Sequence, residues 1–166
     1  AATGKKIAVS ERVEDDIFSP LAGEVLPLSD AEDAAFSEGL LGQGLVLLPT
    51  IGEIKAPFDG VVMTLFPTKH AIGLISDKGT ELLIHIGIDT VELEGQHYEA
   101  FVTQGQAVKR GDKLITFDIA AIEAAGFNTQ TPVIVTNSQI LSKIEMTDQL
   151  KVSTADRLLT IDLANS

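Results

Sequence analysis

The segment TKHAIGLISDKGTELLIHIGIDTV, residues 68–91, contains two apolar runs that are separated by four turn-forming residues. Residues 71–75 and 81–88 have the composition of β-strands, and the Ser-Asp-Lys-Gly sequence between them is typical of a tight turn. The segment therefore predicts an antiparallel hairpin, and it carries two of the three histidines of the chain.

The two histidines of this hairpin are predicted to lie side by side. A two-residue loop at residues 77–78, counted outward, places His70 opposite His85. Directly opposite residues share one face of an antiparallel pair, with Cβ atoms about 4.5–5.5 Å apart. The prediction depends on the loop length, because a three-residue loop shifts the register by one residue and moves one ring to the other face.

Two adjacent imidazole rings are compatible with three kinds of chemistry. They can bind a metal, act as acid and base, or hold a phosphoryl group on one ring while the other ring donates a hydrogen bond to it. A metal site needs a third ligand, and the spacing does not select Glu81 or Asp89 for this role. On spacing alone, incidental polar residues on a half-exposed sheet are the favoured interpretation. The sequence has no Gly-x-Ser-x-Gly elbow and no Walker-type phosphate loop.

Composition narrows the classes of function. The 166 residues suit one globular domain, and 45% of them are hydrophobic. A formal net charge of −12 argues against nucleic acid and anionic lipid as partners and favours a basic protein. The absence of Cys excludes disulfides and thiolate sites. No apolar run approaches the roughly 18 residues of a membrane span, so we expect a cytoplasmic protein without direct membrane insertion, either separate or cut from a longer chain.

The order of the segments predicts an all-β fold. Residues 1–16 are polar and charged and are expected to form a head or linker, with a candidate edge strand at residues 7–9. Residues 17–163 are expected to form a single domain. Short β-type runs separated by Gly, Pro and Asp lie within it at residues 24–26, 45–48, 61–66, 113–119, 132–135 and 159–163. This pattern is typical of an antiparallel β-sandwich or barrel-sandwich hybrid.

Only a few short helical turns are expected. Residues 120–125 are the better candidate, with Asp118 as a possible cap and Gly126 as a stop. A single helical turn is also plausible at residues 33–37.

Apolar residues cluster near the hairpin and near residues 33–37. Besides a place in the hydrophobic core, they could form a docking surface. An apolar patch rimmed by charges of one sign is suited to docking an oppositely charged partner. This hypothesis fails for any side chain that proves to be fully interior. The candidate partner-binding residues are Asp33, Phe36, Leu40, Leu41, Phe66, Ile72, Leu83, Asp89 and Val91.

The two histidine segments resemble those of a known family. PTKHAIG at residues 67–73 and LIHIGIDTV at residues 83–91 are similar to the corresponding segments of glucose-type enzyme IIA domains, which belong to the bacterial phosphoenolpyruvate-dependent sugar phosphotransferase system. The resemblance extends to PLAGEV (20–25), DAAFSEGLLGQG (33–44), APFDG (56–60) and TPV (131–133). It therefore covers roughly residues 18–152 in order. Ile86 and Ile72 stand where these domains often carry aromatic residues.

The resemblance implies an antiparallel β-sandwich and a phosphotransferase role. It implies that His85 accepts a phosphoryl group on Nε2, that His70 hydrogen-bonds the phosphoryl oxygens, that Thr68 orients His70, and that the carbonyl of Gly87 holds the Nδ1 proton of His85. The donor would be the phosphohistidine of the histidine phosphocarrier protein, and the recipient a cysteine on the IIB domain of a sugar permease. No cofactor is required on this basis. Zinc bridging His70 and His85 in a complex, and regulatory protein targets, both stay open.

A carrier domain of the lipoyl or biotin type is the rival from another class. Such domains display a modified lysine at a hairpin tip, where this chain has Lys78. Their Met-Lys-Met or Asp-Lys-Ala signature is absent, and the chain is about twice too long.

Overall fold

The largest sheet is built around the two strands that carry the histidines. In the computed structural model, which describes residues 13–138 and 143–163, its order is β13-β2-β3-β11-β7-β6-β5-β9, and all neighbours are antiparallel. Its strands are β2 (Gly23–Pro27), β3 (Gln43–Pro49), β5 (Gly60–Leu65), β6 (Ala71–Ser76), β7 (Glu81–His85), β9 (Ala107–Val108), β11 (Thr131–Val135) and β13 (Lys151–Val152).

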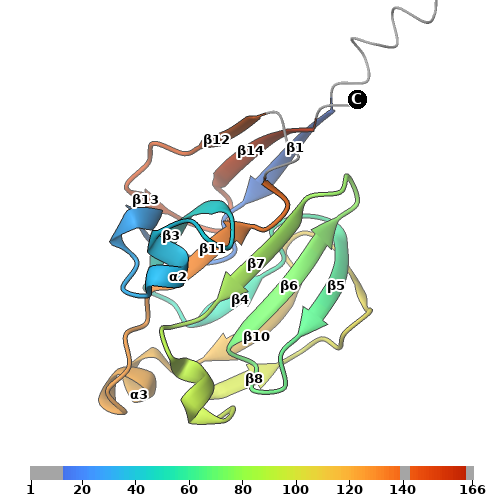
Figure 1. Cartoon of the computed structure of the whole chain (residues 1–166). Helices are drawn as coiled ribbons and strands as arrows, with labels where there is room; N and C mark the ends of the chain where they lie inside the picture. Colours follow the sequence, from blue (N-terminus) through green and yellow to red (C-terminus); the bar gives the residue numbers. More distant parts are fainter. Residues whose placement is uncertain (1–12, 139–142, 164–166) are drawn as a thin grey trace, which may run out of the picture.

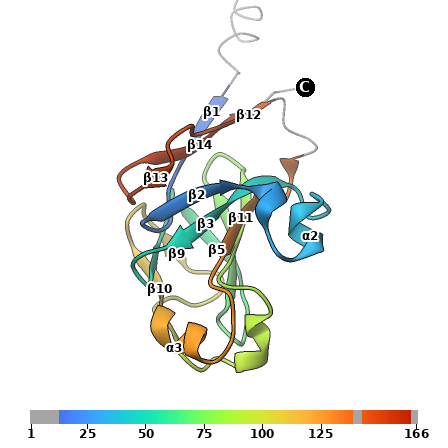
Figure 2. The ribbon, with the colours of Figure 1, turned by 90° about the vertical axis from the view of Figure 1, so that its left-hand side faces the viewer.

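Two three-stranded sheets complete the β-structure. Their orders are β1-β14-β12 and β4-β10-β8. Figures 1 and 2 show the first of them at one end of the large sheet and the short helix α3 at the opposite end. The remaining strands are β1 (Val13–Phe18), β4 (Glu53–Lys55), β8 (Tyr98–Ala100), β10 (Lys113–Phe117), β12 (Lys143–Met146) and β14 (Arg157–Leu163). The prediction of an antiparallel all-β fold is confirmed, and the three sheets are open, without a closed barrel among the described strands.

The helical pieces are short, as the sequence predicts. They are η1 (Leu28–Asp30), α2 (Ala34–Ser37), η2 (Thr90–Leu93) and α3 (Ile119–Ala124). The side chain of Asp33 caps α2 by accepting from Ala35 N, and the side chain of Asp118 caps α3 by accepting from Ala121 N. In the described part of the chain, no helix has the length and apolarity that crossing a membrane requires.

Strand alternation divides the core between the two faces of the large sheet. Leu82 and Ile84 on β7 belong to the main hydrophobic cluster, which lies between the sheets. Leu83 points to the other face, where it packs with Phe36 of α2 and Ile134 of β11 in a smaller cluster. Because side chains two residues apart in a strand share a face, His85 lies on the same face as Leu83 and next to α2.

The predicted register of the histidine hairpin is wrong by one residue. Ile75 pairs with Glu81, and Ala71, not His70, pairs with His85. The turn has three residues, 77–79, because Gly79 adopts a left-handed conformation with φ 106° and its amide bonds to the carbonyl of Ser76. A left-handed residue at the end of the loop is characteristic of three-residue hairpins.

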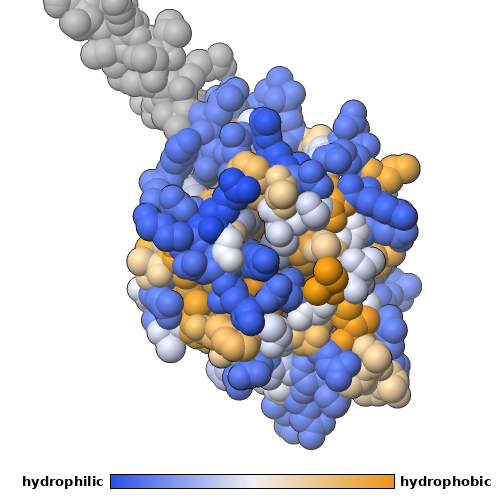
Figure 3. All heavy atoms as spheres, turned by 180° about the vertical axis from the view of Figure 1, so that it is seen from behind, coloured by the Kyte–Doolittle hydropathy of each residue, from blue (hydrophilic) through white to orange (hydrophobic). Residues whose placement is uncertain are grey.

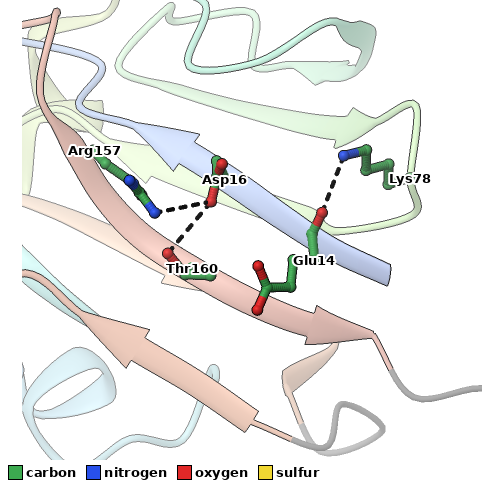
Figure 4. A network of polar contacts seen from close by, with 5 residues as sticks. All are labelled: Glu14, Asp16, Lys78, Arg157 and Thr160. Carbon is green, nitrogen blue, oxygen red and sulfur yellow. Dashed lines mark hydrogen bonds and ion pairs between the residues drawn. The ribbon is translucent and has the colours of Figure 1, made fainter. Parts of the chain in front are cut away.

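Strand β1 begins inside the segment that the sequence assigns to the polar head. It pairs with β14 from Val13 onward, so the boundary expected at residue 17 falls within a strand. The buried carboxylate of Asp15 accepts a 2.5 Å hydrogen bond from Ser76 in the hairpin turn. On the solvent side, Asp16 contacts Arg157 and Thr160 of β14 (Figure 4). The candidate edge strand at residues 7–9 lies outside the described residues.

Large hydrophobic side chains are exposed in several places on the surface. On the face opposite to that of Figure 1, they appear as separate patches between hydrophilic residues (Figure 3). Exposed examples are Leu40, Leu41, Ile51, Met63, Val91, Phe101, Met146 and Leu150. Exposure by itself therefore does not mark a docking surface here.

Candidate functional site

His70 and His85 meet at the open end of the hairpin. Their ring centroids are 4.9 Å apart and the rings are nearly perpendicular, at 80°. The rings meet although the register differs from the prediction, because β6 begins only at Ala71. Lys69, with φ 60°, and His70 form a bend before the strand, and the alternation of faces that holds within β6 does not extend to His70. The local turn thus restores the contact that the register alone would prevent.

The carbonyl of Gly87 orients the ring of His85. His85 Nδ1 lies 2.7 Å from this oxygen. A carbonyl can only accept, so Nδ1 carries the proton of the neutral ring and Nε2 keeps its lone pair. Gly87 has φ 90°, and a Cβ atom there would lie 2.5 Å from Thr90 Cγ2. Only glycine therefore fits this position without strain.

The hydroxyl of Thr68 contacts the other ring. Thr68 Oγ1 lies 2.6 Å from His70 Nδ1. A hydroxyl can donate or accept, so this contact fixes the orientation of the ring without selecting its tautomer. Among the described residues, neither His70 Nε2 nor His85 Nε2 has a hydrogen-bond partner, and both atoms are available for chemistry.

Burial keeps both rings neutral near pH 7. Burial and, to a lesser extent, the neighbouring His85 together lower the pKa of His70 from 6.5 to about 4. Burial also lowers the pKa of His85, while the Gly87 carbonyl and the carboxylates of Asp33 and Asp89 act in the opposite direction. Neutral imidazole is the form that has a lone pair for nucleophilic attack.

Two phenylalanine rings enclose the pair. Phe36 of α2 lies 5.0 Å from the ring of His85, and Phe66 lies 5.5 Å from the ring of His70. Phe36 is only 4% exposed. It therefore packs against the ring of His85 from the protein interior and presents almost no surface to a partner. Such aromatic walls exclude water from one side of the histidines.

The other candidate docking residues differ in exposure. Leu40, Leu41 and Val91 are 72%, 42% and 49% exposed, respectively. Asp89 is exposed, whereas Asp33, Phe66 and Leu83 are half-buried. Ile72 is fully buried in the main core, because its side chain points to the inner face of β6, so the prediction of a surface role for it is wrong.

The sequence did not predict which residues hold the loop after His85. Thr90 and Tyr98 donate to the carbonyl of Ile86, and Gln130 and Asn128 accept from the loop amides through their backbone carbonyls. Thr90 lies only four residues after Ile86, whereas Tyr98, Asn128 and Gln130 come from more distant segments, and no motif marks any of these contacts.

Two other residues lie outside the histidine site: the third histidine, His97, and Lys78, the lysine at the hairpin tip. His97 is exposed on the turn before β8. Lys78, at the hairpin turn, donates to the carbonyl of Glu14 on β1 (Figure 4). Within residues 13–138 and 143–163, no cluster of three or more His, Asp or Glu side chains can hold a metal. Glu81 and Asp89 thus do not complete a metal site with the two rings.

The sequence matches the family described as phosphoenolpyruvate-dependent sugar phosphotransferase system, EIIA 1, over residues 15–141. The beta-glucoside-specific EIIBCA component of Halalkalibacterium halodurans is 47% identical over 148 residues, which are 89% of this chain and 23% of that protein. The beta-glucoside-specific EIIBCA component of Bacillus subtilis is 46% identical over 154 residues, 93% of this chain and 25% of that protein. The chain thus spans about a quarter of the length of these relatives.

A solved structure has the same fold. Glucose permease IIA from Mycoplasma capricolum superposes with a TM-score of 0.84 at 36% identity, over 89% of this chain and 96% of that chain. The fold expected from the resemblance is therefore confirmed in a related protein. Together, the sequence match over residues 15–141 and this superposition establish that the chain belongs to the enzyme IIA family of the phosphoenolpyruvate-dependent sugar phosphotransferase system, whose members are phosphoryl carriers in sugar uptake.

Proposed function

We propose that His85 is the phosphoryl acceptor of this domain and that the group is carried on Nε2. The observation that carries the proposal is the 2.7 Å contact between His85 Nδ1 and the Gly87 carbonyl. This contact keeps the proton on Nδ1 and leaves the Nε2 lone pair beside the ring of His70. A nucleophile held in one tautomer attacks without first having to lose a proton.

The donor in this proposal is the phosphohistidine of the histidine phosphocarrier protein. The lone pair of His85 Nε2 attacks phosphorus, the phosphorus–nitrogen bond to the donor breaks, and its electron pair returns to the donor imidazole. In the onward step, a cysteine thiolate of a sugar-permease IIB domain attacks the same phosphorus. The bond to His85 then breaks, and the ring regains its lone pair. The protein contributes mainly position and charge stabilisation to both steps.

His70 is the stabilising donor in this mechanism. When the Thr68 hydroxyl donates to His70 Nδ1, the proton of the neutral ring lies on Nε2. From there it can be donated to a phosphoryl oxygen on the adjacent ring. The low pKa of His70, about 4, supports this role, because the ring stays neutral at pH 7 and keeps that tautomer. Hydrogen-bond donors aimed at developing charge are among the largest contributions to catalysis.

Partners are proposed to dock around the histidines. Leu40, Leu41 and Val91 supply exposed apolar contacts, and Asp33 and Asp89 add negative charge. This combination suits a partner that presents basic residues around an apolar centre. Leu83 and Phe66 contribute their exposed edges. The same surface is suited to regulatory proteins that distinguish the phosphorylated from the unphosphorylated form.

The proposed role places the domain in the cytoplasm, where phosphoenolpyruvate is available, without insertion into the membrane and without nucleic acid as a partner. The chemistry needs no cofactor. A zinc ion would fit between His70 and His85 only if a partner supplied a further ligand such as a carboxylate, because the two rings provide two nitrogen ligands.

Phosphorylation with labelled phosphoenolpyruvate tests the proposal. The chain is incubated with the first enzyme of the system and the histidine phosphocarrier protein, and the label is mapped on peptides. We expect one acid-labile phosphoryl group per chain on His85. A label on His70 or His97, or an acid-stable label, contradicts the assignment.

A further inference from the structure

The loop that follows β7 is anchored through the amides of its first three residues, 86–88. The amides of residues 86–88 donate to the carbonyls of His70, Gln130 and Asn128 at 2.6, 3.0 and 2.9 Å, respectively. One carbonyl in this stretch, that of Gly87, is then left for the ring of His85. The Gly87 carbonyl shares a peptide with the amide of Ile88, and the preceding peptide, between Ile86 and Gly87, fixes the Cα atom from which this carbonyl projects.

The carbonyl of that preceding peptide, Ile86, accepts two buried hydroxyl groups. Thr90 Oγ1 donates from 2.7 Å and the phenolic oxygen of Tyr98 donates from 2.8 Å. Both lone pairs of the Ile86 oxygen are thus used. Thr90 is fully buried at the start of η2, and Tyr98, 7% exposed, reaches the loop from β8 in another sheet.

We propose that Tyr98 and Thr90 are positioning residues for phosphoryl transfer, because their hydroxyls lock the peptide between Ile86 and Gly87. The Gly87 carbonyl belongs to the next peptide, whose amide, that of Ile88, donates to Asn128. If the peptide between Ile86 and Gly87 shifted, the Cα atom of Gly87 would move with it and carry the Gly87 carbonyl away from His85 Nδ1. The neutral ring would then populate the tautomer that has its proton on Nε2, which has no lone pair for attack. This inference rests on the proposed role of His85 Nε2.

The hydroxyl of Tyr98 can be separated from the packing of its ring. The ring stacks on Phe117 of β10, with centroids 6.2 Å apart and an angle of 25°. Phenylalanine at position 98 would keep this contact and lose the hydroxyl, with its bond to Ile86 and its interaction with Thr90. Outer contacts of this kind set the tautomer and orientation of functional histidines in other sites.

The test combines nitrogen NMR with phosphorylation kinetics. In ¹⁵N-histidine-labelled wild-type protein, we expect His85 to be protonated on Nδ1. In Tyr98→Phe and in Thr90→Val, we expect a larger fraction protonated on Nε2 and a lower pKa of His85. Acceptance of the phosphoryl group should slow about two- to tenfold, the factor that one neutral hydrogen bond carries, with an unchanged KM for the phosphocarrier protein.

Two controls distinguish positioning from a general loss of stability. Thr90→Ser keeps the hydroxyl and should keep the wild-type tautomer. Ser19→Ala removes another buried hydroxyl that donates to a backbone carbonyl, that of Leu21, and should leave the His85 signals unchanged. A wild-type tautomer of His85 in both Tyr98→Phe and Thr90→Val, with folded amide spectra, would overturn the inference.

Failure of the proposed function gives a different result. If the wild-type chain accepts no phosphoryl group while the tautomer shifts in the variants, His85 is positioned as inferred but is not the acceptor. The NMR measurement does not involve phosphorylation, so it decides the positioning role in either case.

Discussion

The two ends of the β6–β7 hairpin use the same strands for opposite purposes. At the turn, Ser76 Oγ donates to Asp15 and accepts from the amides of Lys78 and Thr80. At the open end, each histidine has one ring nitrogen in a hydrogen bond and one without a partner in the described structure. A reactive site needs hydrogen-bonding capacity that folding has not used, whereas at the turn Ser76 Oγ uses both its donor and its acceptor capacity. The turn is not fully paired, because the buried hydroxyl of Thr80 has no partner among the described residues.

The largest functional effect is expected at the open end of the hairpin, from His85→Gln. We expect this variant to accept no phosphoryl group, because glutamine has no nucleophilic ring nitrogen. Its thermal unfolding should stay close to that of the wild type, since the side chain is only half-buried. Labelling with phosphoenolpyruvate provides the measurement, and His97→Gln, which changes an exposed histidine, is the matched control. Residual label in His85→Gln would show that another residue is the acceptor.

Substitution of the second histidine should separate acceptance from delivery. His70→Gln keeps the nucleophile, so we expect it to become labelled on His85. Onward transfer to the IIB domain should slow by about 10²- to 10³-fold, the usual effect of losing one stabilising donor. Rapid-quench measurement of both half-reactions checks this. A His70→Gln chain that carries phosphate on no histidine would refute the division of roles.

Substitution of Gly79 at the hairpin turn and of Gly87 beyond its open end compares how well the backbone tolerates a side chain at the two ends. Gly79 and Gly87 both have positive φ, but a Cβ at Gly79 meets no atom within 4 Å, whereas at Gly87 it meets Thr90. Gly79→Ala should lower the free energy of unfolding by about 1–2 kcal/mol and leave acceptance unchanged. Gly87→Ala should lower the free energy of unfolding by about 1–3 kcal/mol more than Gly79→Ala does. It should also reduce acceptance of the phosphoryl group by His85. Urea unfolding and labelling of both variants measure these effects, and equal losses would contradict the steric argument.

The last prediction concerns the pH dependence of stability. His70 has a pKa of about 4 in the folded chain and about 6.5 when unfolded. The unfolded chain therefore binds the proton first, so the stability present above pH 6.5 is lost as the pH falls toward 4, by up to about 3 kcal/mol. In His70→Gln, the free energy of unfolding should decrease less between pH 6.5 and 4. The decrease that persists is attributed to His85, whose pKa is also lowered by burial. Unfolding curves between pH 4 and 8 test this, and identical slopes for the two proteins would rule it out.

Short-range signals in the sequence account for most of the elements. Asp118 predicts a cap for the helix expected at residues 120–125, and it caps α3, which begins one residue earlier. The single turn expected at residues 33–37 is α2, and its cap, Asp33, was not predicted as such. Alternation and turn residues predict the strands of the hairpin. The loop length was predicted incorrectly, because Ser-Asp-Lys-Gly is compatible with two- and three-residue turns, and the choice depends on the conformation of Gly79.

Part of the candidate site was predicted from the family resemblance and not from short-range signals. The resemblance in the segments around His70 and His85 led to Thr68 and Gly87, and both contact the histidines as that resemblance implies. Which apolar residues face solvent could not be predicted in this way. Ile72 and Leu40 are both aliphatic, yet one is fully buried and the other is 72% exposed.

The sequence by itself is thus sufficient to identify the two candidate histidines, the short strands and the family, because turn chemistry and motif spacing act between near neighbours. The arrangement of the rings depends on contacts over long distances. Lys69 bends the chain into the site, and Tyr98 and Gln130 hold the loop after His85 from other parts of the fold. Such contacts form only when the sheets pack together, since hydrogen bonds between distant segments become favourable once both are withdrawn from water.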